Sequence, residues 1–192
     1  MKFHTSKNEL INISIAWIGL SIAFSILFRF TNPLSIFLNS FLIVGISFLF
    51  HELMHKFVAQ YYGVWAEFRA NIPMLIIAIG FSFLGFIFAA PGGVIILGKL
   101  NKNQDGLVSL AGPFSNIILA ILFLIINLFS SSILLLSFSK FGFFINSLLA
   151  VFNLIPFGHL DGEKVFHWNK IVWAIALIIS SALLIYNYIF LL

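Results

Sequence analysis

The sequence predicts an all-α polytopic membrane protein with about five transmembrane helices and a re-entrant element that carries a short β-strand at the membrane edge. The first basis is composition: 61% of the 192 residues are hydrophobic and 8% are charged, whereas soluble domains carry roughly 25% charged residues. The second is a series of five long apolar runs, four of them without a charged residue; a helix that crosses a bilayer takes roughly 17 to 25 apolar residues. A disordered chain is excluded because disorder requires low hydrophobicity.

Five candidate spans follow one another along the chain. They are Ile11 to about Phe28, Leu34 to about Tyr62, Leu107 to Phe129, Phe141 to Ile155, and Ile171 to Leu191. The first is too long for the apolar region of a signal peptide and lacks a cleavage site of small residues, so we expect it to remain as a span. The fourth is short and ends before Pro156, which cannot continue a helix.

The stretch from Ile72 to Leu97 is apolar but is interrupted by prolines and glycines, and it is too short for a hairpin of two helices. If it enters and leaves on the side of the N-terminus, eight of the ten Lys and Arg face that side, with Arg29 and Lys140 opposite. If it crosses, the split is five to five. Positive charge favours the cytoplasmic side, so we expect a re-entrant element and a cytoplasmic N-terminus. Irregular backbone at membrane depth needs a cavity or protein around it.

The charges and the missing cysteines exclude other classes of protein. The basic residues are scattered, so the net charge of +4 forms no stripe for nucleic acid, and no nucleic-acid partner is expected. Without cysteine, disulfides, thiolate zinc sites and a thiol nucleophile are excluded. Any metal must be held by histidine and carboxylate side chains.

His51-Glu52-Leu53-Met54-His55 is the H-E-x-x-H pattern of zinc sites. Residues four apart share a face of a helix, so both imidazoles can bind one ion while Glu52 lies beside its open coordination position. In a chain of this composition the pattern is expected by chance about 0.003 times. The alternative is that these side chains only bond to neighbouring helices, but ionisable groups inside a span are costly enough to indicate function.

Asp161 is the best candidate for a third ligand. A catalytic zinc ion takes three protein ligands and a water, and two histidines with a carboxylate are a common set. Pro156 ends the preceding helix, and two glycines let the backbone turn the Asp161 carboxylate inward. Asp161 could instead cap a short helix through Trp168. Charge balance favours the metal, because Zn²⁺ with Asp161 and Glu52 ionised is neutral.

Four motifs together resemble the site-2 protease family of intramembrane zinc metalloproteases. In chain order they are His51 to His55, Pro91-Gly92-Gly93-Val94, Ala111-Gly112-Pro113-Phe114-Ser115-Asn116, and the N-x-x-P-x-x-x-L-D-G segment from Asn153 to Gly162. The resemblance covers about residues 40–165, the expected catalytic core of a single membrane-embedded domain over residues 1–192. It is closest to the compact prokaryotic type, since no loop is long enough for a PDZ domain.

The resemblance implies a membrane-edge strand around Val94 to Leu97, after the glycine turn, and roles for five residues. His51, His55 and Asp161 would be ligands of one zinc ion per chain, and Glu52 would be the general base and acid. Asn153 would help to hold the substrate or its oxyanion, although an asparagine in a span can equally join helices.

Residues beside the motifs are expected to have other roles. Gly112 and Asn116 would serve close helix packing. His159 could be a spare ligand or a proton carrier, but its position favours an interfacial histidine near the cytoplasmic mouth. Glu163 stands where the family often has a second glycine.

The function implied is that of an intramembrane zinc metalloendopeptidase, which hydrolyses a peptide bond within or near a transmembrane segment of a membrane-protein substrate, as in regulated intramembrane proteolysis. We expect it in the cell membrane, in contact with the lipid bilayer, with its active site toward the cytoplasmic side. One alternative is a zinc transporter, but the outer halves of the spans offer almost no ligands. Another is a non-catalytic membrane scaffold, which the intact motif set disfavours.

Overall fold

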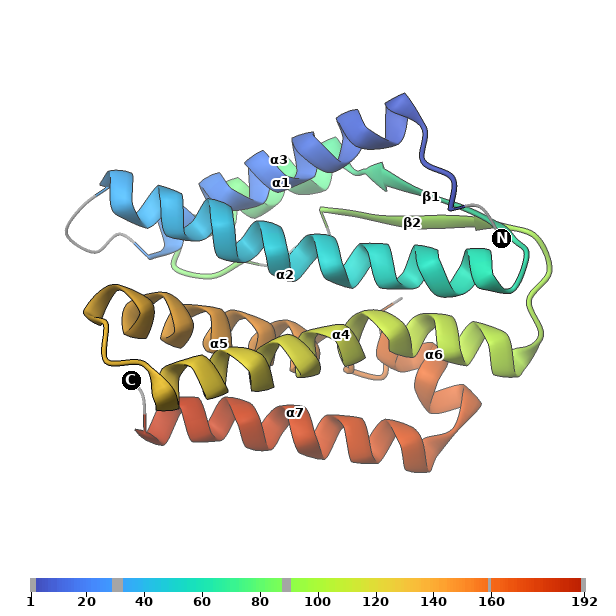
Figure 1. Cartoon of the computed structure of the whole chain (residues 1–192). Coiled ribbons are helices and arrows are strands. Elements are labelled where there is room, and N and C mark those ends of the chain that lie inside the picture. The colour runs from blue at the N-terminus through green and yellow to red at the C-terminus, as the bar shows by residue number, and fades with distance from the viewer. Residues whose placement is uncertain (1–2, 29–32, 88–90, 159, 191–192) are drawn as a thin grey trace.

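Five long helices form the bundle in the structure, a computed structural model that describes residues 3–28, 33–87, 91–158 and 160–190. All five are long and apolar enough to cross a membrane, which confirms the all-α polytopic class. They are α1 (Lys7–Leu27), α2 (Pro33–Tyr61), α4 (Lys102–Phe129), α5 (Ile133–Asn153) and α7 (Lys170–Phe190). Consecutive members of this set run in opposite directions (Figure 1).

The predicted start of the fourth span, at Phe141, is wrong, because α5 already begins at Ile133. Polar residues between Ile133 and Phe141 are accommodated in the helix. The hydroxyl of Ser139 donates to the carbonyl of Leu136 and accepts from Asn127 of α4, while Lys140 is exposed. The helix ends at Asn153, so it has the length of a full span.

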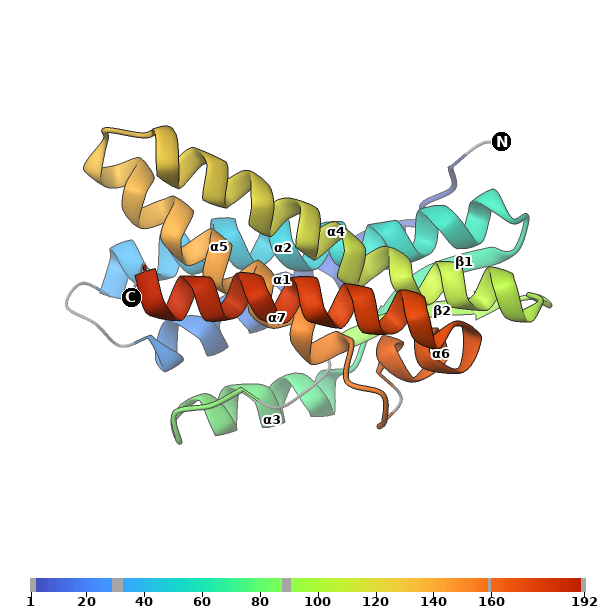
Figure 2. The ribbon, with the colours of Figure 1, turned by 90° about the horizontal axis from the view of Figure 1, so that it is seen from below.

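The segment between α2 and α4 leaves and re-joins the bundle at the same end, as the charge count predicted. It consists of β1 (Trp65–Ala70), the 11-residue helix α3 (Ile72–Ser82), which is too short to span, and β2 (Gly92–Leu97). The strands pair antiparallel, with Trp65 opposite Leu97 and Ala70 opposite Gly92. The predicted strand is thus confirmed and extends back to Gly92, whereas β1 was not predicted. Figure 2 shows α3 at one side of the bundle.

Two clusters of buried apolar side chains pack the helices of the bundle against one another. One joins α1, α2, β1 and α5 through residues such as Leu20, Val44, Phe68 and Ile145. The other joins α4, α5 and α7 through Ile117, Ala150, Leu154 and Ala176. Helices α2 and α5 therefore lie between α1 on one side and α7 on the other (Figure 1).

A buried ion pair fixes the start of α1 against α2 and β1. The Lys56 ammonium lies 2.5 Å from Glu9 Oε2, and both side chains are about 1% exposed. The other oxygen of Glu9 accepts the backbone N–H of Phe68 at 3.0 Å, and Asn12 Oδ1 accepts that of Ala70 at 3.0 Å. Side chains of α1 therefore cover the outer edge of β1, and the lysine that follows the H-E-x-x-H motif is neutralised without adding charge to the motif.

Candidate metal centre

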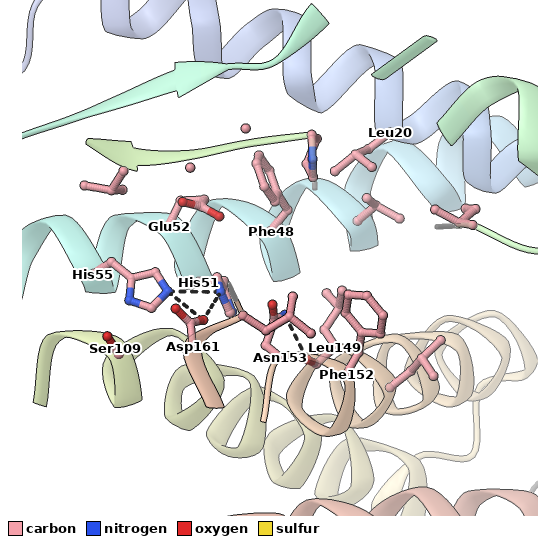
Figure 3. A pocket seen from close by; sticks show the side chains of 18 of the residues that line it. Leu20, Phe48, His51, Glu52, His55, Ser109, Leu149, Phe152, Asn153 and Asp161 are labelled. Carbon is pink, nitrogen blue, oxygen red and sulfur yellow. Dashed lines mark hydrogen bonds and ion pairs between the residues drawn. The ribbon is translucent and has the colours of Figure 1, made fainter. Parts of the chain in front are cut away.

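Three potential ligand atoms converge between α2 and α6 (Asp161–Trp168) (Figure 3). The Nε2 atoms of His51 and His55 are 3.1 Å apart. Asp161 Oδ2 lies 3.2 Å from His51 Nε2 and 3.1 Å from His55 Nε2. Three ligands at about 2 Å from one tetrahedral zinc ion would be roughly 3.3 Å apart, so the spacing and the donor set fit zinc. The structure thus brings together the three residues predicted as ligands.

The chain between α5 and α6 turns Asp161 toward the histidines. Gly158 has a φ of 76°, which favours glycine. A side chain at Gly162 would collide with the carbonyl of Leu154, so glycine lets α6 pack against the end of α5. The N-cap of α6 is Leu160, without a side-chain cap bond. Asp161 therefore bonds to the histidines instead of capping the helix.

The carboxylate of Asp161 is stabilised in its ionised form. Burial alone would raise the pKa of this carboxyl, but the charge of His55 and hydrogen bonds from His51 and His55 hold the pKa well below its usual range. An ionised carboxylate is the form that binds a metal.

Both histidines have a hydrogen-bond acceptor behind them. His51 Nδ1 lies 2.6 Å from Asn116 Oδ1, and His55 Nδ1 lies 2.7 Å from the carbonyl oxygen of Val108. Since these oxygens can only accept, each Nδ1 carries a hydrogen, so that loss of the hydrogen on Nε2 would leave a lone pair there for a metal. Outer partners of this kind orient metal-bound histidines and raise their basicity.

The A-G-P-x-x-N motif of α4 contacts the predicted histidine ligands, in addition to the helix packing that was predicted for it. Gly112 does allow close packing, because a side chain there would collide with the imidazoles of His55 and His51. Asn116, expected only to pack, bonds to a predicted ligand. The signal that could have revealed this was the spacing of Gly112 and Asn116, which places both on one face of α4.

Glu52 faces a cavity of about 590 Å³ beside the three ligand atoms (Figure 3). Its side chain lies below β2 and interacts with the backbone amide of Val94. Apolar residues of α1, α2 and α5, among them Leu20, Phe48 and Leu149, line the rest of the cavity. One end is therefore polar and carries the predicted general base, while the other is apolar.

Asn153 lies on the cavity wall at the end of α5 (Figure 3). Its Nδ2 donates to the carbonyl of Leu149 at 2.9 Å, within its own helix, so this bond does not join two helices. To hold a substrate through that hydrogen, Asn153 would have to exchange this bond, and its role stays a prediction. His159 lies outside the described residues.

Comparison with known proteins identifies the family. A model of peptidase family M50 matches residues 40–133. "Putative zinc metalloprotease MJ0611" of Methanocaldococcus jannaschii is 42% identical over 177 residues, which are 90% of this chain and 91% of that protein. "Zinc metalloprotease MJ0392" of the same organism is 30% identical over 130 residues, 65% of this chain but 32% of that longer protein. No solved structure matches the chain. The resemblance found in the motifs is thereby confirmed, and the chain belongs to peptidase family M50, the site-2 protease family.

Proposed function

We propose that this zinc metalloprotease hydrolyses a peptide bond within or near a transmembrane segment of a membrane-protein substrate, as in regulated intramembrane proteolysis. The observation that carries the proposal is the convergence of His51, His55 and Asp161 at the polar end of an apolar cavity inside a bundle of candidate spans. The test is whether the purified chain cuts a transmembrane peptide in lipid and whether Glu52→Gln stops the cut.

In the proposed reaction, Glu52 moves the proton. Zinc held by His51, His55 and Asp161 would polarise the substrate carbonyl and acidify a water molecule. As the water oxygen bonds to the carbonyl carbon, a carboxylate oxygen of Glu52 accepts the proton. Glu52 then donates it to the leaving amine nitrogen as the C–N bond breaks.

Transport of zinc is less well supported. Within residues 3–28, 33–87, 91–158 and 160–190, His51, His55 and Asp161 are the one group of histidines and acids close enough to hold a metal. A transport path would need further ligands toward both faces.

The free edge of β2 supports binding of an extended substrate. The backbone N–H groups of Phe68 and Ala70 donate to side chains of α1, so these N–H groups point away from β2. In an antiparallel pair, when the main-chain groups of one residue point away from the partner strand, so do those of the residue directly opposite. The residues opposite Phe68 and Ala70 are Val94 and Gly92. Both of these line the cavity, so their main-chain groups face it.

A substrate helix must unwind before cleavage, because its carbonyls are hydrogen-bonded and surrounded by side chains. The edge of β2 could form hydrogen bonds with the main-chain groups that unwinding frees in the substrate, without selecting particular substrate side chains. The cavity follows α2 from His55 to Val44, about 16 Å at 1.5 Å per residue. At roughly 3.3 Å per extended residue this is room for about five substrate residues.

Ile96→Pro should slow cleavage because it removes an edge N–H. Ile96 lies opposite Ala66, whose carbonyl accepts from Gln60, so the N–H of Ile96 also points away from β1, and proline is tolerated at such an edge. Loss of one hydrogen bond predicts a roughly 2- to 10-fold lower kcat/KM, measured on a transmembrane peptide in liposomes, with unchanged zinc content.

Ile96→Ala is the matched control, since it trims the side chain but keeps the N–H. Equal rates for the two variants would argue against strand pairing. Position 96 is preferable to Val94, whose amide also interacts with Glu52, and to Ile95, which pairs toward β1.

The proposed orientation has a cytoplasmic N-terminus and an active site toward the cytoplasm. The end of the bundle that carries the N-terminus also carries the starts of α4 and α7 (Figure 1), with Lys99, Lys102 and Lys170. Cytoplasmic loops are enriched in such residues. Because the chain has no cysteine, single cysteines can report the orientation.

We expect Ser131→Cys, in the exposed α4–α5 connection at the opposite end, to react with a membrane-impermeant maleimide added to intact cells. Lys99→Cys, also exposed, should react only after the membrane is opened. The reverse pattern would contradict the proposed orientation.

A further inference from the structure

A chain of hydrogen bonds runs from His51 into the apolar interior of the bundle. It passes through Asn116 of α4 to Asn146 of α5 and Ser47 of α2, three side chains that are fully buried. Asn146 is not among the residues that line the cavity, and its side chain bonds to Asn116, Ser47 and Gly142, none of which is a predicted ligand. Its buried amide therefore calls for another explanation.

The amide of Asn116 can support His51 in one of its two orientations. With Oδ1 toward His51, it accepts from Nδ1 at 2.6 Å. Turned by 180°, it would present an N–H donor, and His51 could bond to it only by moving its own hydrogen to Nε2. That atom would then have no lone pair for a metal, so the orientation of Asn116 decides whether His51 can act as a ligand.

Two acceptors hold Asn116 in the useful orientation. Its Nδ2 donates to the carbonyl oxygen of Ser47 at 3.1 Å and to Asn146 Oδ1 at 3.0 Å. A backbone carbonyl can only accept. Asn146, in contrast, has an amide that could itself turn, so its own orientation must be fixed.

Asn146 is fixed by groups that cannot exchange roles. Its Nδ2 donates to the carbonyl oxygen of Gly142 and to Ser47 Oγ, each at 2.8 Å. The hydroxyl of Ser47 gives its own hydrogen to the carbonyl of Ile43 at 2.7 Å, so its oxygen accepts from Asn146. The hydrogen bonds that Asn146 donates therefore lead to the main-chain oxygens of Gly142 and, through Ser47, of Ile43. Nδ2 of Asn146 must face these acceptors, which leaves Oδ1 facing Asn116.

We infer that Asn146 is a positioning residue that strengthens metal binding by locking the Asn116 amide with its oxygen toward His51. This inference rests on the proposed metal site. A purely structural role would be to join α4 to α5, and Asn127 provides a comparison for that role. It is also buried, and its Nδ2 joins the same two helices by donating to Ser139 Oγ at 3.1 Å, eleven residues along α4 from Asn116.

The experiment measures the zinc dissociation constant of the full-length chain in detergent, by competition with a chromophoric chelator. Loss of an outer partner of a metal ligand typically costs about 10- to 100-fold in affinity. Because Asn146 acts through Asn116, we expect the lower value, about tenfold, for Asn146→Leu. Asn127→Leu should lower the melting temperature of the metal-free protein but leave the dissociation constant within about twofold of wild type.

Asn146→Asp is the conservative rescue: buried away from any cation, the acid is neutral, so it can keep an oxygen toward Asn116 and donate its hydroxyl to the carbonyl of Gly142, and it should bind zinc within about threefold of wild type. If Asn146→Leu does not fold, Asn146→Ala takes its place, as it also lacks the acceptor. Equal zinc affinity in the Asn146 and Asn127 variants would overturn the inference. His51→Ala tests the site itself: if it binds zinc like wild type, the proposed metal site fails whatever the Asn146 variants do.

Discussion

Replacing Glu52 by glutamine is expected to abolish detectable cleavage of a transmembrane substrate while the protein retains its zinc. Glutamine has nearly the same shape but no carboxylate to accept the proton of the attacking water. General acid–base catalysis contributes about 10²- to 10⁴-fold to a rate, so kcat should fall by that range. Glu52 is not one of the three convergent ligand atoms, and zinc content, measured by atomic absorption, should stay at one ion per chain.

Glu67→Gln is the matched control. Glu67 is also a buried carboxylate, but it belongs to β1 and lies 2.9 Å from Arg69, outside the cavity lining. This variant should cut the same peptide at near the wild-type rate. If Glu52→Gln were as active as Glu67→Gln, Glu52 would not be the general base.

The same pair of proteins can identify the substrate. Fragments released from the membranes of cells that make the wild-type chain, and absent from cells that make Glu52→Gln, are the expected products. Their new ends would show where each substrate is cut. Ends that lie only in water-exposed loops, far from any transmembrane segment, would contradict cleavage within the membrane.

The parts of the site that lie within one helix were the easiest to predict from the sequence. His51, Glu52 and His55 share a helix whose periodicity decides their positions. Asp161 is over one hundred residues away, and it could be predicted because acidic residues are scarce in this chain and because of the family motif around it. The spans and the re-entrant segment followed from the lengths of apolar runs and the distribution of positive charge.

What the sequence did not reveal depends on contacts between elements. Nothing in the pattern of Trp65 to Ala70 distinguishes a strand from a loop, because its pairing partner β2 and the side chains of α1 that cover it lie elsewhere in the sequence. The bonds that His51 donates to Asn116 and His55 to the carbonyl of Val108 likewise require α4 to pass close to α2. Polar residues inside spans predict partners but not which partners they have.

Asp161→Asn is expected to weaken zinc binding by more than the roughly 10- to 100-fold that loss of an outer partner costs. The amide keeps the shape of the side chain but removes the negative charge and the anionic ligand, so that two histidines must hold a dication at low dielectric. A zinc competition assay on the purified protein measures the effect. Asp105→Asn is the control, because Asp105 is a partly exposed carboxylate paired with Lys164 and should leave zinc affinity unchanged.

Stability offers an independent measurement of the same contact. Zinc that binds only the folded chain stabilises it by RT ln(1 + [Zn]/Kd), about 2.7 kcal/mol at one hundred times Kd. In the proposed site the ion would join α2 to α6, two elements separated by most of the chain, so added zinc should raise the melting temperature of the wild type and of Asp105→Asn. Asp161→Asn should show little or no rise at the same zinc concentration. A full zinc-dependent rise in Asp161→Asn would mean that the ion is held without α6, and the carboxylate would then have to be assigned another role.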